Sequence, residues 1–126
     1  MSATFDRTRL DALNSADEVD IEISRSADSP VHRVTIWIVV DGDTPYIRSV
    51  RGPAGRWYRE LSANPRGAIH VDGRRLAITA EPSADAETIR RVSEALTNKY
   101  AQRWPEPLAS MLRDGVLSTT MRVEPA

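Results

Sequence analysis

Hydrophobic and polar residues alternate along the first half of the chain in the pattern of β-strands. Residues 18–24 place Val19, Ile21 and Ile23 between acidic residues, which predicts a strand with one buried and one exposed face. The next stretch, residues 31–40, is rich in β-branched side chains and predicts a second, longer strand. An Asp-Gly-Asp-Thr sequence then favours a hairpin turn into a third strand, expected over the seven residues that begin with Pro-Tyr-Ile.

The second half of the chain predicts three more strands. Residues 67–71 and 74–82 flank Asp72-Gly73, a dipeptide typical of a two-residue hairpin turn. The last strand is expected at residues 116–124, where apolar and polar residues again alternate near the end of the sequence.

Four segments have the spacing or the boundary residues of helices. They cover residues 7–13, 56–65, 83–104 and 108–112. In the longest one, Ser83 or Asp85 is the expected N-cap, and Ile89, Val92 and Leu96 recur at helical spacing. Its charged residues are expected to form a solvated face with pairing along the helix.

This order of elements predicts an α+β fold that is mainly β. Strands joined by hairpins form an antiparallel sheet, and six of them with few helices should curl into a barrel that protects the sheet edges. The sequence contains no repeat and no linker-like segment, so residues 1–126 are expected to form a single domain.

Charge and composition exclude several classes of function. The net charge is −1, from 17 basic and 18 acidic residues, so neither nucleic acid nor an anionic membrane is an expected partner. The sequence has no cysteine, which excludes disulfides and thiol chemistry. The longest apolar run, Ile36–Val40, is too short to span a bilayer, and the N-terminal residues lack the apolar stretch of a signal peptide. We therefore expect a cytoplasmic protein.

The segment from Ser49 to Glu60 is the strongest candidate for a ligand site. It combines two glycines with three arginines and the Trp57-Tyr58 pair, just before a predicted helix. Glycine lets the backbone approach a ligand, and a helix N-terminus together with Arg51, Arg56 or the nearby Arg48 favours a phosphate group. The alternative is an exposed loop in which the glycines serve a tight turn and the arginines face water.

Other chemistry-bearing residues give weaker signals. His32 and His70 are far apart in sequence and lack a neighbouring nucleophile, so we interpret them as strand histidines rather than general bases or zinc ligands. Trp104 is interpreted as a core residue. No serine lies in a nucleophile motif. The sequence therefore identifies neither a catalytic acid or base nor a metal site.

Several short motifs resemble the deazaflavin-dependent nitroreductases, a group within the flavin-binding split β-barrel superfamily that includes pyridoxamine-phosphate oxidase. The matching residues are Arg51-Gly52, Trp57-Tyr58, Leu61 with Ala63-Asn64-Pro65, and Gly73-Arg74. Over nearly its full length the chain most resembles a small bacterial family of unknown function, through TIWIV, RSVRGPAGRWYRE and NKYAQRW. The resemblance implies a six-stranded antiparallel split β-barrel with flanking helices.

The resemblance also implies a cofactor, a partner and a set of binding residues. The cofactor would be FMN or a deazaflavin coenzyme held between the subunits of a homodimer, and the reaction a hydride transfer to a small organic substrate. The implied cofactor-binding residues are Arg33, Thr35, Ile36 and Trp37 on the second strand, Ser49, Arg51 and Gly52 in the loop, and Trp57, Tyr58 and Arg59 at the helix start.

Two features of the loop depart from the deazaflavin relatives. Arg51 stands where these relatives usually carry lysine, and the loop before Trp57 is shorter than theirs. Arginine is a good phosphate ligand, but a shorter loop could narrow or remove the site. A fold alone does not confer activity, and the sequence offers no obvious proton donor. The alternative function is therefore a non-catalytic ligand-binding or structural split-barrel dimer.

Overall fold

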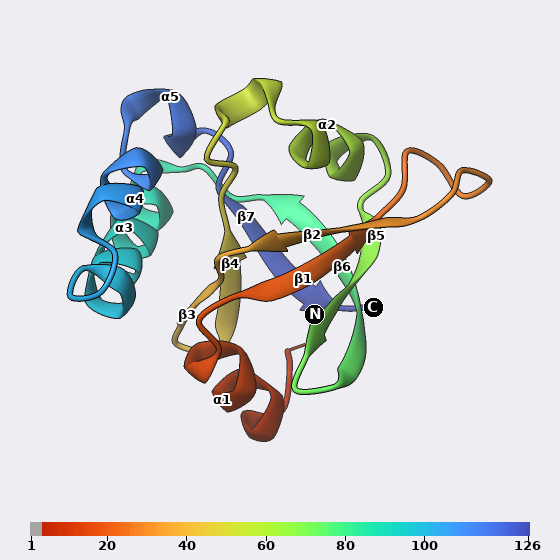
Figure 1. Ribbon diagram of the computed structural model, residues 1–126, viewed down its shortest axis with the longest axis horizontal. Helices are drawn as coiled ribbons and strands as arrows, with labels where there is room; N and C mark the ends of the chain where they lie inside the picture. The colour runs from red at the N-terminus through yellow and green to blue at the C-terminus, as the bar shows by residue number, and fades with distance from the viewer. Residues whose placement is uncertain (1–3) are drawn as a thin grey trace.

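The computed structural model describes residues 4–126, in which seven antiparallel strands form one strongly curled sheet (Figure 1). The strands are β1 (Val19–Ile23), β2 (His32–Ile36), β3 (Val39–Asp41), β4 (Thr44–Ile47), β5 (Arg66–Val71), β6 (Arg74–Pro82) and β7 (Met121–Pro125). The helices are α1 (Arg7–Ser15), α2 (Arg56–Ala63), α3 (Ala86–Tyr100), α4 (Pro105–Met111) and α5 (Asp114–Leu117), with a 3₁₀ turn at Gly52–Ala54. The α+β class and the antiparallel barrel-like sheet were both predicted.

The predicted strand at residues 31–40 is in fact two strands, and the prediction of six strands was therefore wrong. The first half, β2, pairs with β1, whereas the second half, β3, pairs with β4. The order across the sheet is β2-β1-β5-β6-β7-β4-β3, which places these two strands at opposite ends. Only Trp37 and Ile38 connect them, so the sheet must curl until its two ends meet. The alternation of apolar and polar residues in the sequence shows that a segment is a strand, but it does not show that the two halves pair with different strands.

Two side chains at the end of α3 bond to the backbone at this crossing. The Tyr100 hydroxyl accepts the Ile38 N–H (3.4 Å) and lies 3.2 Å from the Ile38 carbonyl and 2.9 Å from that of Asp17. Lys99 Nζ donates to the carbonyls of Ile38 (2.8 Å) and Leu13 (3.1 Å). Burial raises the pKa of Tyr100 to about 12 and lowers that of Lys99 to about 8. Because Ile38 lies in neither strand, these bonds replace the missing sheet partners.

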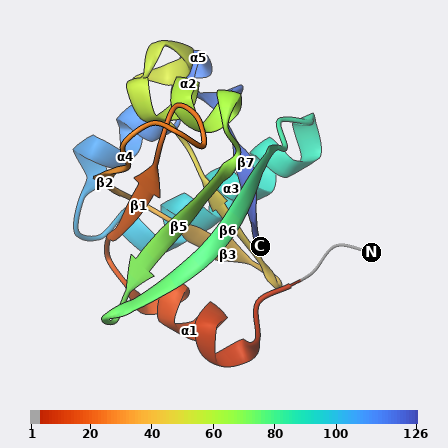
Figure 2. The ribbon, with the colours of Figure 1, turned by 90° about the vertical axis from the view of Figure 1, so that its right-hand side faces the viewer.

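The helices cover the openings of the curled sheet. In Figure 1, α3, α4 and α5 lie together on one side, α2 lies across one end, and α1 lies across the other. Figure 2 shows the long β5–β6 hairpin that forms the wall away from α3 and α4. The main core fills the inside of the sheet, with Ile21, Ile69 and Ile78 fully buried. A second apolar cluster joins α3 and α4 to β3.

Local signals in the sequence predicted most turns and helix starts. Asp72 and Gly73 have positive φ angles of 51° and 72°, as a two-residue hairpin turn requires. Asp85, one of the two candidate N-caps, accepts a hydrogen bond from the Thr88 N–H (3.1 Å). In the part of the chain that the structure describes, none of the helices has the length and apolar character of a membrane span.

Two predicted strands are shorter than expected. The last strand begins only at Met121, because the hydroxyls of Thr119 and Thr120 donate to the carbonyls of Val116 and Leu117 (2.6 and 2.8 Å) and hold a helical turn. The third strand ends at residue 47 rather than 51. Arg48 and Ser49, which follow the strand, are buried.

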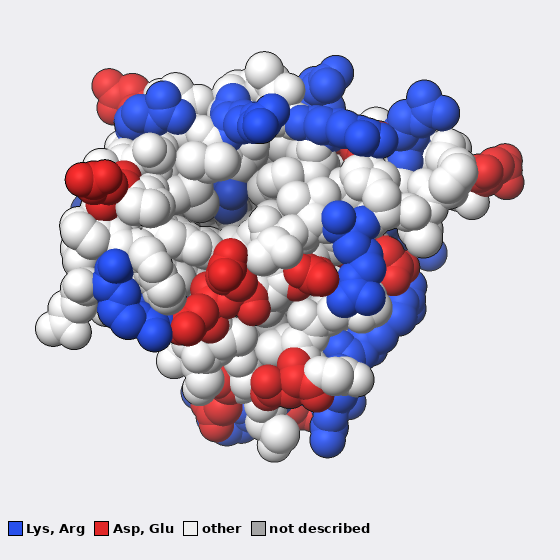
Figure 3. Space-filling view, viewed as in Figure 1, with Lys and Arg blue, Asp and Glu red and all other residues white. Residues whose placement is uncertain are grey.

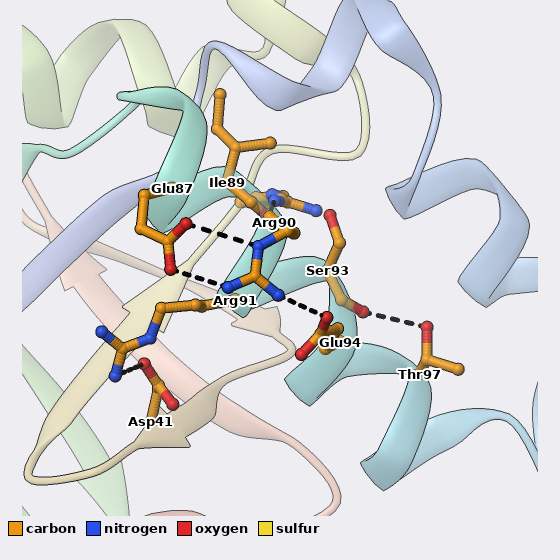
Figure 4. A network of polar contacts seen from close by, with 9 residues as sticks. Asp41, Glu87, Ile89, Arg90, Arg91, Ser93, Glu94 and Thr97 are labelled. Atoms are coloured by element: carbon orange, nitrogen blue, oxygen red, sulfur yellow. Dashed lines mark hydrogen bonds and ion pairs between the residues drawn. The ribbon is translucent and has the colours of Figure 1, made fainter.

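The charged residues of α3 form the solvated face that the sequence predicts (Figure 4). Arg90 lies between Glu87 and Glu94, with both ion pairs at 2.7 Å. Arg91 reaches Asp41 of β3, also at 2.7 Å. Exposed pairs of this kind contribute little stability each, so this face adds little to the stability of the fold.

Glu22 links β1 to the β5–β6 hairpin and is mostly buried. Its carboxylate accepts hydrogen bonds from Arg75 (2.7 and 3.3 Å) and from His70 Nε2 (3.0 Å). The bonds from Arg75 and then His70 lower its pKa from 4.5 to about 2, although burial opposes them. Because the native state holds this carboxylate ionised, its contribution to stability is present above pH 4.5 and is lost as the pH falls toward 2.

We predict that Glu22→Gln lowers the free energy of unfolding at pH 7 by about 2 kcal/mol. The loss of stability between pH 4.5 and 2 should also become shallower in the variant. Urea unfolding at a series of pH values measures both effects. Glu94→Gln, which removes an exposed ion pair, is the matched control and should change stability by less than about 0.5 kcal/mol. If stability fell as steeply between pH 4.5 and 2 in Glu22→Gln as in the wild-type protein, Glu22 would not be the group responsible.

Gly67 allows the close approach of β5 to β1. A Cβ atom at this position would collide with the carbonyl oxygen of Glu22 in the neighbouring strand. We predict that Gly67→Ala destabilises the fold by about 3 kcal/mol or more, because backbone on both sides must move. Gly115→Ala is the control, since a Cβ there has no heavy atom within 4 Å. Thermal unfolding compares the stability of the two variants. Equal melting temperatures would show that β5 can move away from β1 without destabilising the fold.

Candidate functional site

A cavity of about 850 Å³ opens along β2, at the end of the curled sheet. Its other walls are the segment that follows β4, the start of α2, and α4. Figure 3 shows a hollow near the centre of this face, with a basic side chain at its floor and further basic side chains along the rim above. The volume lies in the range of pockets that hold a cofactor-sized molecule.

Arg48 brings a buried positive charge to this cavity. Its side chain donates to Thr120 Oγ1 (2.8 Å) and to the carbonyls of Ile89 (2.9 Å) and Met111 (3.2 Å), and the residue is only 2% exposed. No ion pair within residues 4–126 includes Arg48, and burial lowers its pKa to about 10. A guanidinium carries five N–H groups, so two are not used by these three bonds.

The N-terminus of α2 lies in the same wall. Arg56 and Trp57 line the cavity, and no side chain caps this end of the helix. The first backbone N–H that bonds within the helix is that of Arg59, to the Gly55 carbonyl (3.0 Å). The preceding N–H groups therefore lack intrahelical partners, and the helix end carries a partial positive charge.

The glycine loop is not the open amide cradle that its sequence suggests. The Gly52 N–H donates to the Ser49 carbonyl (2.9 Å), and the Gly55 N–H donates to the Gly52 carbonyl (3.1 Å). The Ser49 hydroxyl also donates to Gly52 (2.9 Å). Gly52 is a glycine because its φ angle is +70° and a Cβ would lie 2.8 Å from the Gly115 carbonyl oxygen. Both glycines thus serve the turn and its packing.

Most of the binding residues implied by the family resemblance share this cavity. Those that line it are Arg33, Thr35, Ile36, Trp37, Ser49, Arg51 and Trp57. Gly52, Tyr58 and Arg59 are not among its lining residues. Tyr58 packs on the main core, and Arg59 borders a second cavity of about 670 Å³.

Arg33 and Thr35 of the cavity wall share one acidic partner. Arg33 forms an ion pair with Asp20 (3.1 Å), and the Thr35 hydroxyl donates to the same carboxylate (2.8 Å). Arg51 is exposed at the cavity rim. Among these cavity arginines, Arg48 is the one that is buried and has no carboxylate partner within residues 4–126. Arg33 and Arg51, which the resemblance implies, are exposed.

Aromatic side chains form the wall at the far end of β2. Trp37 stacks on Tyr100 with ring centroids 3.8 Å apart and an interplanar angle of 7°. Trp104 lies 6.2 Å from Trp37, is only partly buried and also lines the cavity. The interpretation of Trp104 as a core residue was therefore incomplete, because one side of this aromatic cluster faces the cavity.

Two residues of the site were not among the binding residues that the resemblance implies. Arg48 was one of three arginines considered for a phosphate, and an arginine inside an otherwise apolar strand pattern signals a buried or site-facing cation. His32 was set aside because no acid lies near it in the sequence. In the structure it pairs with Glu60, 28 residues further along the chain.

Solved structures with the same fold include oxidoreductases. One described as an F420-H2 dependent reductase shares 16% identity with a TM-score of 0.63, over 86% of this chain and 94% of that chain. One from Listeria innocua, described as a candidate pyridoxamine 5'-phosphate oxidase, shares 16% identity with a TM-score of 0.61, over 94% and 90%. A third, described as a domain-swapped dimer, shares 16% with a TM-score of 0.63, over 86% and 80%. Identity this low shows the fold alone.

No curated protein matches the sequence. A family model does match, over residues 9–123, and its family is described as an uncharacterized protein conserved in bacteria, DUF2255. The match covers the whole sheet except the last two residues of β7, together with the cavity. The chain therefore belongs to the bacterial family DUF2255, and it has the split β-barrel fold of the reductase-like and pyridoxamine-phosphate-oxidase-like proteins.

Proposed function

We propose that the cavity binds the phosphate and ring of FMN or of a deazaflavin coenzyme, and that the protein transfers a hydride to a small organic substrate. The observation that carries this proposal is the buried guanidinium of Arg48, which has no carboxylate partner within residues 4–126. A buried charge without a counterion is costly. A bound phosphate would supply the missing negative charge.

The groups around Arg48 suit a phosphate. The uncapped N-terminus of α2 offers free N–H groups, and such a helix end favours an anion. Arg56 and Arg51 are exposed at the cavity, where they add positive potential without being fixed by burial. These features support a site for an anionic group without relying on the loop glycines.

The remaining walls suit a flat ring. Ile36, Trp37 and Trp57 line the cavity and give it apolar and aromatic surface against which a ring system can pack. When bound, the coenzyme supplies the hydride chemistry. The residues of the chain bind it, orient it and exclude water from its reactive face.

The homodimer is part of this proposal. The cavity lies along β2 at one end of the sheet, and a second subunit would cover its open side. One neighbouring structure is described as a domain-swapped dimer, which supports association in this fold. The alternative function, a non-catalytic binding or structural dimer, is favoured by the engagement of Arg33 and Thr35 with Asp20.

We predict that the protein binds FMN more tightly than riboflavin, which lacks the phosphate, and that Arg48→Met removes this preference. The affinity for FMN should fall by about tenfold or more, since a charge-assisted hydrogen bond contributes about 1.5–3 kcal/mol. Quenching of flavin fluorescence measures both ligands, and the deazaflavin coenzyme is titrated in the same way. Arg66→Met, an exposed arginine outside the cavity, is the matched control.

Arg48→Lys keeps a positive charge and guards against a variant that fails to fold. It should retain part of the phosphate preference if circular dichroism shows a native fold. The proposal would fail if the folded wild-type protein bound neither FMN nor the deazaflavin coenzyme. If both Arg48 variants bound FMN as tightly as the wild-type protein, Arg48 would not be the phosphate ligand.

A further inference from the structure

His32 and Glu60 form a hydrogen-bonded pair between β2 and α2. His32 Nε2 bonds to a Glu60 carboxylate oxygen, and Arg56 Nε lies 3.4 Å from the other oxygen. Glu60 is 8% exposed. Burial alone would raise its pKa, but the bond and charge of His32 and the charge of Arg56 outweigh burial and hold the pKa below its ordinary value. Glu60 is therefore an ionised carboxylate that fixes the imidazole ring.

The pairing determines which ring nitrogen faces a ligand. A carboxylate only accepts hydrogen bonds, so Nε2 must carry the hydrogen that it shares with Glu60. Nδ1 of His32 forms no hydrogen bond with residues 4–126, and no buried side-chain nitrogen or oxygen in this range lacks a partner. Nδ1 is therefore accessible. His32 lines the main cavity, at the opposite end of β2 from Trp37.

His70 provides an internal comparison. It forms the same kind of pair, Nε2 to Glu22 at 3.0 Å, and is about as buried as His32. However, its carboxylate is shared closely with Arg75, and His70 lines neither the main cavity nor the second cavity. A histidine–carboxylate pair therefore occurs in this sheet without a cavity beside it, and His32 differs from His70 by lying in a cavity wall.

We propose that His32, oriented by Glu60, is the catalytic acid that protonates a substrate bound in the main cavity. This role rests on the proposed function. It also names the substrate class: acceptors in which hydride addition creates a negative charge on oxygen, such as quinones and conjugated carbonyl compounds. A carboxylate that fixes one imidazole nitrogen while the other transfers a proton is a recurring arrangement in acid–base catalysis.

The proton and electrons balance in this step. The acceptor gains two electrons and one hydrogen as a hydride from the reduced coenzyme, and a carbonyl π-bond electron pair moves onto its oxygen. The Nδ1–H bond of the imidazolium breaks as a new O–H bond forms. The imidazole is left neutral and regains a proton from water, while the Nε2–H bond to Glu60 persists throughout.

The charged groups around His32 favour an oxyanion beside it. Glu60 stabilises the protonated ring, while Arg56 on α2 and Arg33 on β2 border the same cavity. Arg25 and Arg59 border the second cavity, which His32 also lines. Arg33 is paired with Asp20, and Glu18 also lines the main cavity, next to the β1 residue that pairs with Ile36 rather than His32. The other charged groups beside His32 are basic apart from Glu60, so the potential at Nδ1 supports developing negative charge.

The first test needs no coenzyme. 4-Nitrophenolate is added as an oxyanion probe while the imidazole nitrogens are followed by NMR. We expect the His32 signals to shift and those of His70 to remain. His32→Gln, which can still donate to Glu60, should weaken binding of the probe about tenfold, whereas His70→Gln should not. Binding without a shift at His32, or with equal affinity in His32→Gln, would overturn the proposal.

The second test separates this role from the proposed function. With coenzyme affinity measured first, His32→Gln should bind the coenzyme as the wild-type protein does but reduce menadione about a hundredfold more slowly. Glu60→Gln should show a smaller loss, and His70→Gln none. Coenzyme binding with undiminished turnover in His32→Gln would overturn the acid role alone. Failure of the wild-type protein to bind coenzyme would overturn the proposed function and, with it, this role.

Discussion

The crossing at Trp37 and Ile38 is the constraint on which the rest of the structure depends. These two residues join strands at opposite ends of the sheet, so the sheet can form only if it curls and closes on itself. The Ile38 backbone then lacks strand partners, and the Tyr100 hydroxyl and Lys99 ammonium replace them. The end of α3 therefore closes the barrel, and the same tyrosine fixes Trp37 by stacking.

The curled sheet creates the environment that makes Arg48 unusual. The chain leaves β4 after residue 47 and bonds to Met111 at the end of α4 and to Thr119 after α5. The Arg48 guanidinium is buried there, beside the cavity. Its three partners are neutral oxygens, so they satisfy hydrogen bonds without neutralising the charge. A fold that keeps such a charge beside a cavity gives up stability there, and we propose ligand binding as the reason.

The features that local chemistry controls could be predicted from the sequence. The hairpin at Asp72-Gly73 and the N-cap at Asp85 depend only on neighbouring residues, and both are present. The split of residues 31–40 and the pair of His32 with Glu60 depend on which distant segments meet, and a single sequence does not contain that information. The family resemblance carries information about which segments meet, and most of the residues that it implied line the cavity. The roles of Gly52 and Arg48 became visible only from their contacts in the structure.

The central claim is that the buried guanidinium of Arg48 is neutralised by a ligand phosphate. A crystal structure of the protein grown with saturating FMN tests it most directly. We expect phosphate oxygens within hydrogen-bond distance of Arg48 and of the first N–H groups of α2, with the ring against Trp37. FMN bound with its phosphate remote from Arg48, or a cavity that stays empty at saturating FMN, would contradict the account.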